Sequence, residues 1–161
     1  MFILTQRITK GLLKMNFNEK INDNKKKHMF GVAQFMYEQA PKYNLNPEEM
    51  YTLGLLHDIG YIYDGWKEHE EKGSNLLKNL GFKYYKEVEQ HGMDISDGDI
   101  LSKEAMLLIA ADSCVDFEGN IGDFNSRRKD IENRYDKSDR QFYLDRFDRR
   151  IAYLRKHGFN Y

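Results

Sequence analysis

A histidine and an aspartate stand side by side at the end of an apolar run in the segment GLLHDIGY, residues 54–61. Because the surrounding pattern predicts a buried helix, His57 and Asp58 are expected to point into the interior of the protein. Burying an unpaired carboxylate costs several kcal/mol unless a positive charge is nearby. The pair therefore requires a neutralising partner, and a bound metal ion is a candidate.

Four further polar residues fall on apolar faces of other predicted helices, by the rule that residues three, four and seven positions apart share a face. A lone inward histidine is more often a satisfied core residue than a ligand. The whole set is harder to explain in this way, because we expect no lysine or arginine on these faces to neutralise the carboxylates. Neutral imidazoles and carboxylates suit Zn, Mn, Fe, Co or Ni, and helical bundles build metal sites from facing helices. These four residues are His28, His69, His91 and Asp112.

The elements that would position these side chains are helices. Asn46 and Pro47 are typical of a helix N-terminus, and that helix runs toward His57. Gly60 is expected to end it in the left-handed conformation. Alternating strand patterns are missing, so the predicted fold class is all-α, a single helical bundle. Further helical periodicity covers residues 28–40, 69–80, 84–91, 102–117 behind a Ser102 cap, and 139–156.

Composition narrows the class of protein. A chain of 161 residues with 40% hydrophobic and 32% charged residues is expected to fold as one domain, residues 1–161. Its single cysteine excludes a disulfide framework, and no apolar run approaches the roughly 18 residues that span a bilayer. Residues 1–15 lack the apolar core of a signal peptide, so we expect a cytoplasmic protein with no membrane partner.

The charges near the C-terminus alternate in sign. The segment RRKDIENRYDKSDR, residues 127–140, is typical of a surface helix with ion pairs, and a phosphate-binding face is the alternative. Because basic residues are interleaved with acids and the net charge is −1, no nucleic-acid polymer is expected as a partner.

Taken in order, His28, HDIG at residues 57–60 and Asp112 resemble the HD superfamily of metal-dependent phosphohydrolases. The resemblance covers roughly residues 28–119. It implies a single HD-type helical domain with the metal site between core helices at about 28–119. Helical periodicity and an excess of Lys and Arg over acids from Asn125 onward predict basic C-terminal helices at about 125–157. Three more segments are similar to family motifs: HEEKG at 69–73, HG at 91–92 and AADSCVDFEGN at 110–120.

The resemblance also implies roles for these residues. One divalent ion would be held by His28, His57, Asp58 and Asp112. His69 and His91 would hold a second ion, with Asp58 bridging the two, and the metal-activated water would attack phosphorus. If only one ion binds, His69 and His91 would contact the substrate phosphate or relay a proton, so the candidate catalytic residues are Asp58, His69 and His91. The ions expected are Fe, Mn, Co, Ni or Zn, with Mg also compatible.

One position departs from the family pattern. Many members read HDIGK, and Tyr61 stands here where they have lysine. The charge that this lysine offers to a substrate phosphate must then come from Lys72, Arg127 or Arg128, each of which has a solvated surface charge as its alternative. Tyr61, or Trp66 nearby, is a candidate for stacking on a base.

The function that the resemblance implies is metal-dependent hydrolysis of a small phosphorylated substrate, such as a nucleotide or a related phosphate ester. Two alternatives stay open: an HD-type di-iron oxygenase, and a non-catalytic module that binds a metal or a nucleotide. Neither the substrate nor the oligomeric state follows from the sequence.

Overall fold

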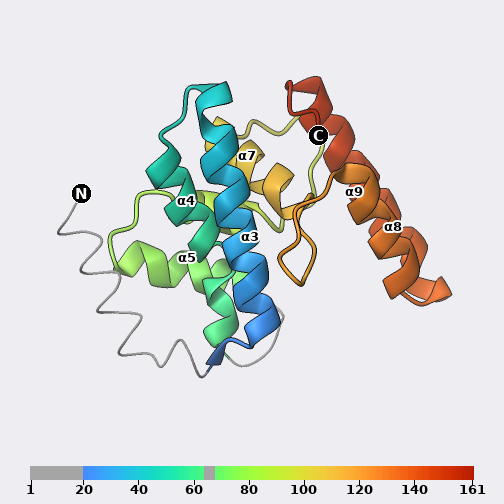
Figure 1. Cartoon of the computed structure of the whole chain (residues 1–161), viewed down its shortest axis with the longest axis horizontal. Helices are drawn as coiled ribbons and strands as arrows, with labels where there is room; N and C mark the ends of the chain where they lie inside the picture. Colours follow the sequence, from blue (N-terminus) through green and yellow to red (C-terminus); the bar gives the residue numbers. More distant parts are fainter. Residues whose placement is uncertain (1–19, 64–67) are drawn as a thin grey trace.

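The computed structural model describes residues 20–63 and 68–161, and over these ranges the chain is helical (Figure 1). The described part contains no strand, only an isolated bridge between Val115 and Ile121. The predicted all-α fold class is therefore confirmed. The α-helices are α3 (Asp23–Gln39), α4 (Pro47–Leu56), α5 (His69–Asn79), α6 (Tyr85–Gln90), α7 (Lys103–Asp112), α8 (Phe124–Arg134) and α9 (Lys137–Lys156), with two 3-10 helices, η1 (Ala40–Tyr43) and η2 (Ile59–Ile62).

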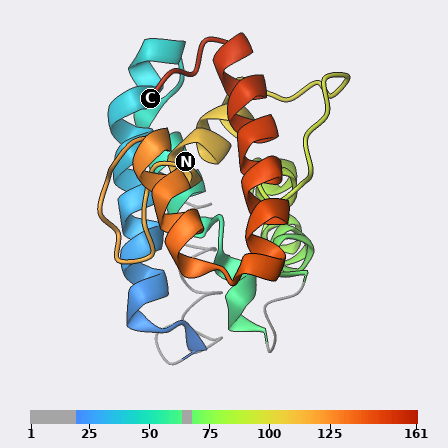
Figure 2. The same cartoon turned by 90° about the vertical axis from the view of Figure 1, so that its right-hand side faces the viewer.

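An apolar core joins α3, α4 and α7, which pack against one another. Val32 and Met36 from α3, Leu53 from α4, and Leu108 and Ile109 from α7 are fully buried in it. Removal of this apolar surface from water is the main force that holds the helices together. Helices α5 and α6 pack on each other beside this core. Helices α8 and α9 lie side by side at one end of the molecule and face the viewer in Figure 2.

Side-chain caps fix the starts of four helices, including α8, where the Asp123 carboxylate accepts a hydrogen bond from the Ser126 amide at 2.7 Å. The carboxamide oxygen of Asn46 accepts a hydrogen bond from the Glu49 amide at 3.0 Å, and the Ser102 hydroxyl accepts one from the Ala105 amide at 3.1 Å, which confirms both predicted caps. Asn22 caps α3 in the same way. Helix α3 therefore begins five residues before the start predicted at position 28, because the polar residues before that position form its first turns.

The structure corrects two predicted helix ends. The helix predicted over 102–117 ends at Asp112, and a loop then leads to α8. Gly60 does not adopt the left-handed conformation, since positive φ among the described glycines occurs only at other positions. Instead, Gly60 lies in η2, and a Cβ atom there would come within 1.8 Å of the His69 carbonyl oxygen. Close approach of two backbones, rather than a φ value, requires glycine at this position.

The charged segment at 127–140 forms parts of two helices. Helix α8 ends at Arg134 and α9 begins at Lys137, so the alternating charges lie on two successive helices. The predicted ion pairs are present, for example between Arg127 and Asp130 at 2.6 Å. No helix in the described part is long and apolar enough to cross a membrane. The expectations for residues 1–15 and for Trp66 lie outside the described residues.

Replacing Glu49 by glutamine is expected to lower the free energy of unfolding by about 1 kcal/mol at pH 7. Lys83 Nζ lies 2.8 and 2.7 Å from the two Glu49 carboxylate oxygens, and the Tyr84 hydroxyl donates to one of them at 2.5 Å. Lys83 and Tyr84 thereby lower the pKa of Glu49 from its ordinary 4.5. Because the pKa is lower in the folded protein, this stabilisation is present above pH 4.5 and is lost as the pH falls through the folded value.

Urea denaturation of the wild type and of Glu49→Gln at pH 7 and pH 3 would measure this loss. Glu48→Gln is the matched control, since Glu48 lies in the same first turn of α4 and shares any interaction with the helix dipole. Equal destabilisation by both substitutions at pH 7 would contradict the assigned role of Lys83 and Tyr84.

Candidate metal centre

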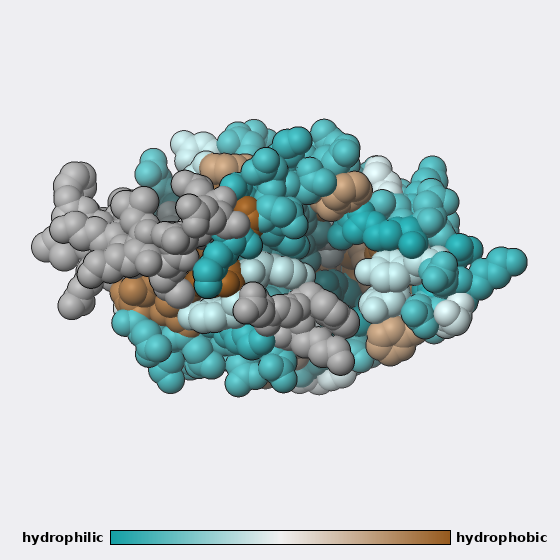
Figure 3. All heavy atoms as spheres, turned by 90° about the horizontal axis from the view of Figure 1, so that it is seen from below, coloured by the Kyte–Doolittle hydropathy of each residue, from teal (hydrophilic) through white to brown (hydrophobic). Residues whose placement is uncertain are grey.

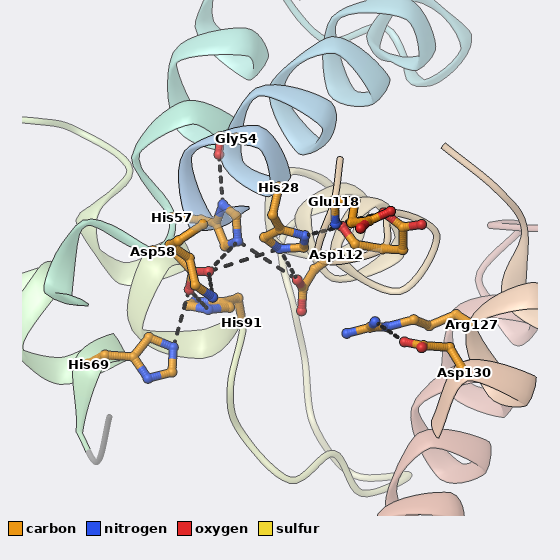
Figure 4. A network of polar contacts seen from close by, with 12 residues as sticks. His28, Gly54, His57, Asp58, His69, His91, Asp112, Glu118, Arg127 and Asp130 are labelled. Carbon is orange, nitrogen blue, oxygen red and sulfur yellow. Dashed lines mark hydrogen bonds and ion pairs between the residues drawn. The ribbon is translucent and has the colours of Figure 1, made fainter. Parts of the chain in front are cut away.

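Six titratable side chains from five helices converge at one place in the interior (Figure 4). Most of them stand at helix ends, where a short side chain can reach a shared centre. His57 and Asp58 directly follow α4, and His91 directly follows α6. The remaining three positions are His28 in the second turn of α3, His69 at the first residue of α5 and Asp112 at the last residue of α7.

Three of the four histidines are oriented by a hydrogen bond between Nδ1 and a backbone carbonyl oxygen. A backbone carbonyl can only accept, so the histidine that contacts it carries its proton on Nδ1 and keeps the Nε2 lone pair free. This arrangement is typical of histidines that bind metals through Nε2. The carbonyl partners are Gly54 O for His57 (2.7 Å), Val88 O for His91 (2.5 Å) and Asp116 O for His28 (2.9 Å). The Nδ1 atom of His69 instead lies 3.2 Å from the carboxylate oxygen Glu70 Oε2.

Asp58 stands between two pairs of histidines. Its Oδ2 atom lies 3.4 Å from His57 Nε2 and 3.9 Å from His28 Nε2. Its Oδ1 atom lies 3.2 Å from His69 Nε2 and 3.5 Å from His91 Nε2. One carboxylate therefore turns a different oxygen to each pair, as a bridging ligand would.

Asp112 joins only one of the two pairs. Its Oδ1 atom lies 3.0 Å from His28 Nε2 and 3.7 Å from His57 Nε2. We name the two groups of side chains the first lobe and the second lobe. The first lobe consists of His28, His57, Asp58 and Asp112, and the second lobe consists of Asp58, His69 and His91.

The electrostatics of the centre fit a cation. Burial opposes the charge of Asp58, but His57 and the other facing imidazoles outweigh it and hold the pKa of this carboxyl well below its usual value. Burial also opposes the charge of Asp112, yet His28 lowers the pKa of Asp112 in the same way. The Nε2 atom of His57 is buried and has no hydrogen-bond partner among the described residues. A divalent metal ion would satisfy this lone pair and both carboxylates at once.

Lys25 also reaches the centre, although the sequence analysis missed it. Its Nζ atom lies 2.8 Å from Asp58 Oδ2 and 4.1 Å from the centroid of the Tyr61 ring. Burial opposes the ammonium charge, but Asp58 outweighs it and raises the pKa of Lys25. The expectation that no lysine lies on the ligand-bearing faces is therefore wrong. Lys25 precedes His28 by three positions, so the helical spacing could have revealed it had the start of α3 been placed correctly.

The four predicted substrate-binding residues lie in different parts of the molecule. The Tyr61 ring lies beside the His69 ring, with centroids 4.2 Å apart, and therefore borders the second lobe. Lys72 lies on α5, partly exposed, with Nζ 4.0 Å from a Glu68 carboxylate oxygen. Arg128 ties α8 to α9 through Asp148 at 2.9 Å, whereas Arg127 points toward Asp112 (Figure 4).

Arg127 belongs to a pocket that opens beside Asp112, between α7, α8 and α9. The pocket has a volume of about 110 Å³. We name it the arginine pocket, because four arginines line it together with Asp112. They are Arg127, Arg134, Arg146 and Arg150, of which the sequence analysis identified only the first.

The fold and the centre define a helical domain with a buried histidine and aspartate cluster suited to metal binding. The HD domain family model matches residues 26–115, more than half of the chain. The chain therefore belongs to the HD domain family of metal-dependent phosphohydrolases, and the resemblance identified from the sequence motifs is confirmed.

A more distant similarity extends to a larger protein. The chain is 33% identical over 115 residues to "Ribonuclease Y" of Symbiobacterium thermophilum, an alignment that covers 68% of this chain and 22% of that protein. The chain thus spans about a fifth of the length of this relative. No solved structure matches the chain.

Proposed function

We propose that this protein hydrolyses a phosphate ester of a small nucleotide-like substrate at a centre for two divalent ions. The observation that carries the proposal is the division of the cluster into two lobes that share Asp58. Two such lobes suit a pair of transition-metal ions among Fe, Mn, Co, Ni and Zn. We further propose that residues 1–161 act as one domain, with the core at about 28–119 and with α8 and α9 beside the site.

When bound, the ions would polarise a phosphate oxygen and lower the pKa of a water molecule. The protein's part is to hold the ligands in position. The carbonyls that accept from Nδ1 fix the imidazole rings with Nε2 directed at the centre. Lys25, beside Asp58, would bind a phosphate oxygen of the substrate and so supply the charge that Tyr61 lacks. His69, less buried than His57, would give a proton to the leaving group if the second ion is absent.

Elemental analysis of protein purified without added metal tests the two-lobe assignment. We expect close to two metal ions per chain in the wild type, none in His57→Ala and one or fewer in His69→Ala. His157→Ala is the matched control, because His157 is exposed at the C-terminus of α9 and hydrogen bonds to the Tyr153 carbonyl at 2.8 Å. Absence of metal from every sample, even after reconstitution with Mn, Fe, Co, Ni and Zn, would overturn the proposal and favour a non-catalytic helical module.

The metal found also decides between hydrolysis and oxygenation. Two iron ions per chain together with O₂ uptake would favour the di-iron oxygenase alternative, since the same ligand types serve both chemistries. Release of inorganic phosphate or a nucleoside without O₂ uptake would support the hydrolase.

A second candidate function is hydrolysis of a phosphodiester in RNA. It is favoured by the 33% identity over 115 residues with the protein named Ribonuclease Y. A panel of phosphomonoesters, nucleotides and short RNA oligonucleotides would separate the two candidates, because only the second predicts that chain cleavage exceeds monoester turnover.

A further inference from the structure

The arginine pocket carries more positive charge than its neighbours neutralise. Asp130 is shared by two of its arginines, with Arg127 Nη1 at 2.6 Å and Arg134 Nη2 at 2.9 Å. The other two, Arg146 and Arg150, have no carboxylate within 4.0 Å among the described residues. This excess charge beside a buried centre is the signature of a site for an anion.

Arg146 and Arg150 donate to backbone carbonyls in the segment that follows His91. Arg146 contacts the carbonyl of Gly92, and Arg150 contacts that of Met93 at 3.2 Å. Each of these contacts uses one terminal nitrogen, whereas a guanidinium has five N–H donors in a planar fork. Burial lowers the pKa of Arg150, because its guanidinium group loses part of its hydration. A bound anion would stabilise this charge. Arg146 and Arg150 therefore keep further N–H donors for a ligand while they hold the segment after His91 in place.

The pocket borders the first lobe at Asp112. Asp112 lines the pocket and also lies 3.0 Å from His28 Nε2 in the first lobe. The Arg127 guanidinium is directed from α8 toward Asp112 (Figure 4). The surface formed by α8 and α9 is mostly hydrophilic, and a hollow lies beside it in the view from below (Figure 3). A molecule bound at the metal centre could therefore extend into the pocket.

We propose that the arginine pocket binds a second, non-reacting phosphate group of the substrate, an inference that rests on the proposed function. The substrate would then be a nucleotide with two phosphate groups, one at the metal centre and one among the arginines. Guanidinium groups bind phosphate through paired hydrogen bonds, which suits them to this role better than lysines. Tyr135 and Tyr143, whose rings stack at 3.9 Å, line the same pocket and would border the sugar or base.

Calorimetric titration with adenosine 3′,5′-bisphosphate and with adenosine 5′-monophosphate tests the proposal, in EDTA so that no turnover occurs. The wild type should bind the bisphosphate about tenfold more tightly than the monophosphate. Arg150→Gln should lose this preference, and Arg149→Gln should keep it. Arg149 is the matched control, because it neighbours Arg150 on α9 but pairs with Asp94 at the surface. Arg134→Gln, at an exposed position, should reduce the preference even if Arg150→Gln does not fold.

Circular dichroism would verify that each protein is folded in EDTA. If removal of metal unfolds the chain, the same comparison is made by kinetics with the protein as purified, where Arg150→Gln should raise KM for the bisphosphate about tenfold with little change in kcat. Equal binding of the two nucleotides by the wild type, or an equal loss in Arg149→Gln, would overturn the inference. Retained preference without any hydrolysis would overturn only the proposed function.

Discussion

Asp58→Asn is expected to abolish metal binding at both lobes and to lower phosphate ester hydrolysis by about a hundredfold or more. Asp58 turns Oδ2 toward His57 and Oδ1 toward His69, and it is the residue common to both lobes. Asparagine keeps the shape but has one oxygen and no charge, and its amide group would present N–H donors to an imidazole. Replacing a residue that only orients a metal ligand lowers metal affinity or activity roughly 10- to 100-fold. Replacing a ligand that both ions share should lower them at least as much.

Metal content and turnover would be measured on the same preparations of Asp58→Asn and two comparison variants. Asp112→Asn should spare the second lobe, since among the four histidines of the centre the ion-pair distances of Asp112 are to His28 and His57. Asp139→Asn makes the same chemical change at an exposed position in the first turn of α9, and it should leave the metal content and the turnover unchanged. Two ions per chain in Asp58→Asn would refute the bridging role.

The helical repeat explains why the metal centre could be predicted from the sequence. Positions three, four and seven residues apart share a face whatever the rest of the chain does, so the inward direction of His28 and Asp112 is a local property. Lys25 obeys the same rule but was missed, because the predicted helix began at position 28 and so left out the first turns of α3 that follow the Asn22 cap. The error concerned the helix boundary, which local patterns define least well.

The arginine pocket depends on contacts between distant parts of the chain. Arg146 and Arg150 reach carbonyls that lie 54 and 57 positions away, and no local pattern specifies such a pairing. In sequence, the same arginines alternate with acids and are typical of an ordinary solvated surface. All three arginines contact the segment after His91, but Arg149 pairs with the exposed Asp94 carboxylate, whereas Arg146 and Arg150 donate to backbone carbonyls and line the pocket.

Gly60→Ala is expected to destabilise the protein by about 3 kcal/mol and to remove metal from the second lobe only. The new Cβ would lie 1.8 Å from the His69 carbonyl oxygen and 2.9 Å from the Gly73 amide nitrogen, both of which are backbone atoms of α5. Rotation of a side chain cannot relieve such an overlap, so α5 must move as a unit, and a forced backbone shift in a packed region costs 1–3 kcal/mol or more. His69 begins α5 and would move with it.

Gly98→Ala provides the matched control for this prediction. A Cβ at Gly98 meets nothing within 4 Å, and neither glycine has a positive φ, so alanine fits the backbone conformation at both positions. We expect Gly98→Ala to change the free energy of unfolding by less than about 0.5 kcal/mol and to leave the metal content unchanged. Denaturant titration and elemental analysis of both variants would show whether the steric contact at Gly60 causes the loss of stability and of metal. If Gly60→Ala were as stable as Gly98→Ala and still bound two ions, close packing of η2 against α5 would not be what positions His69.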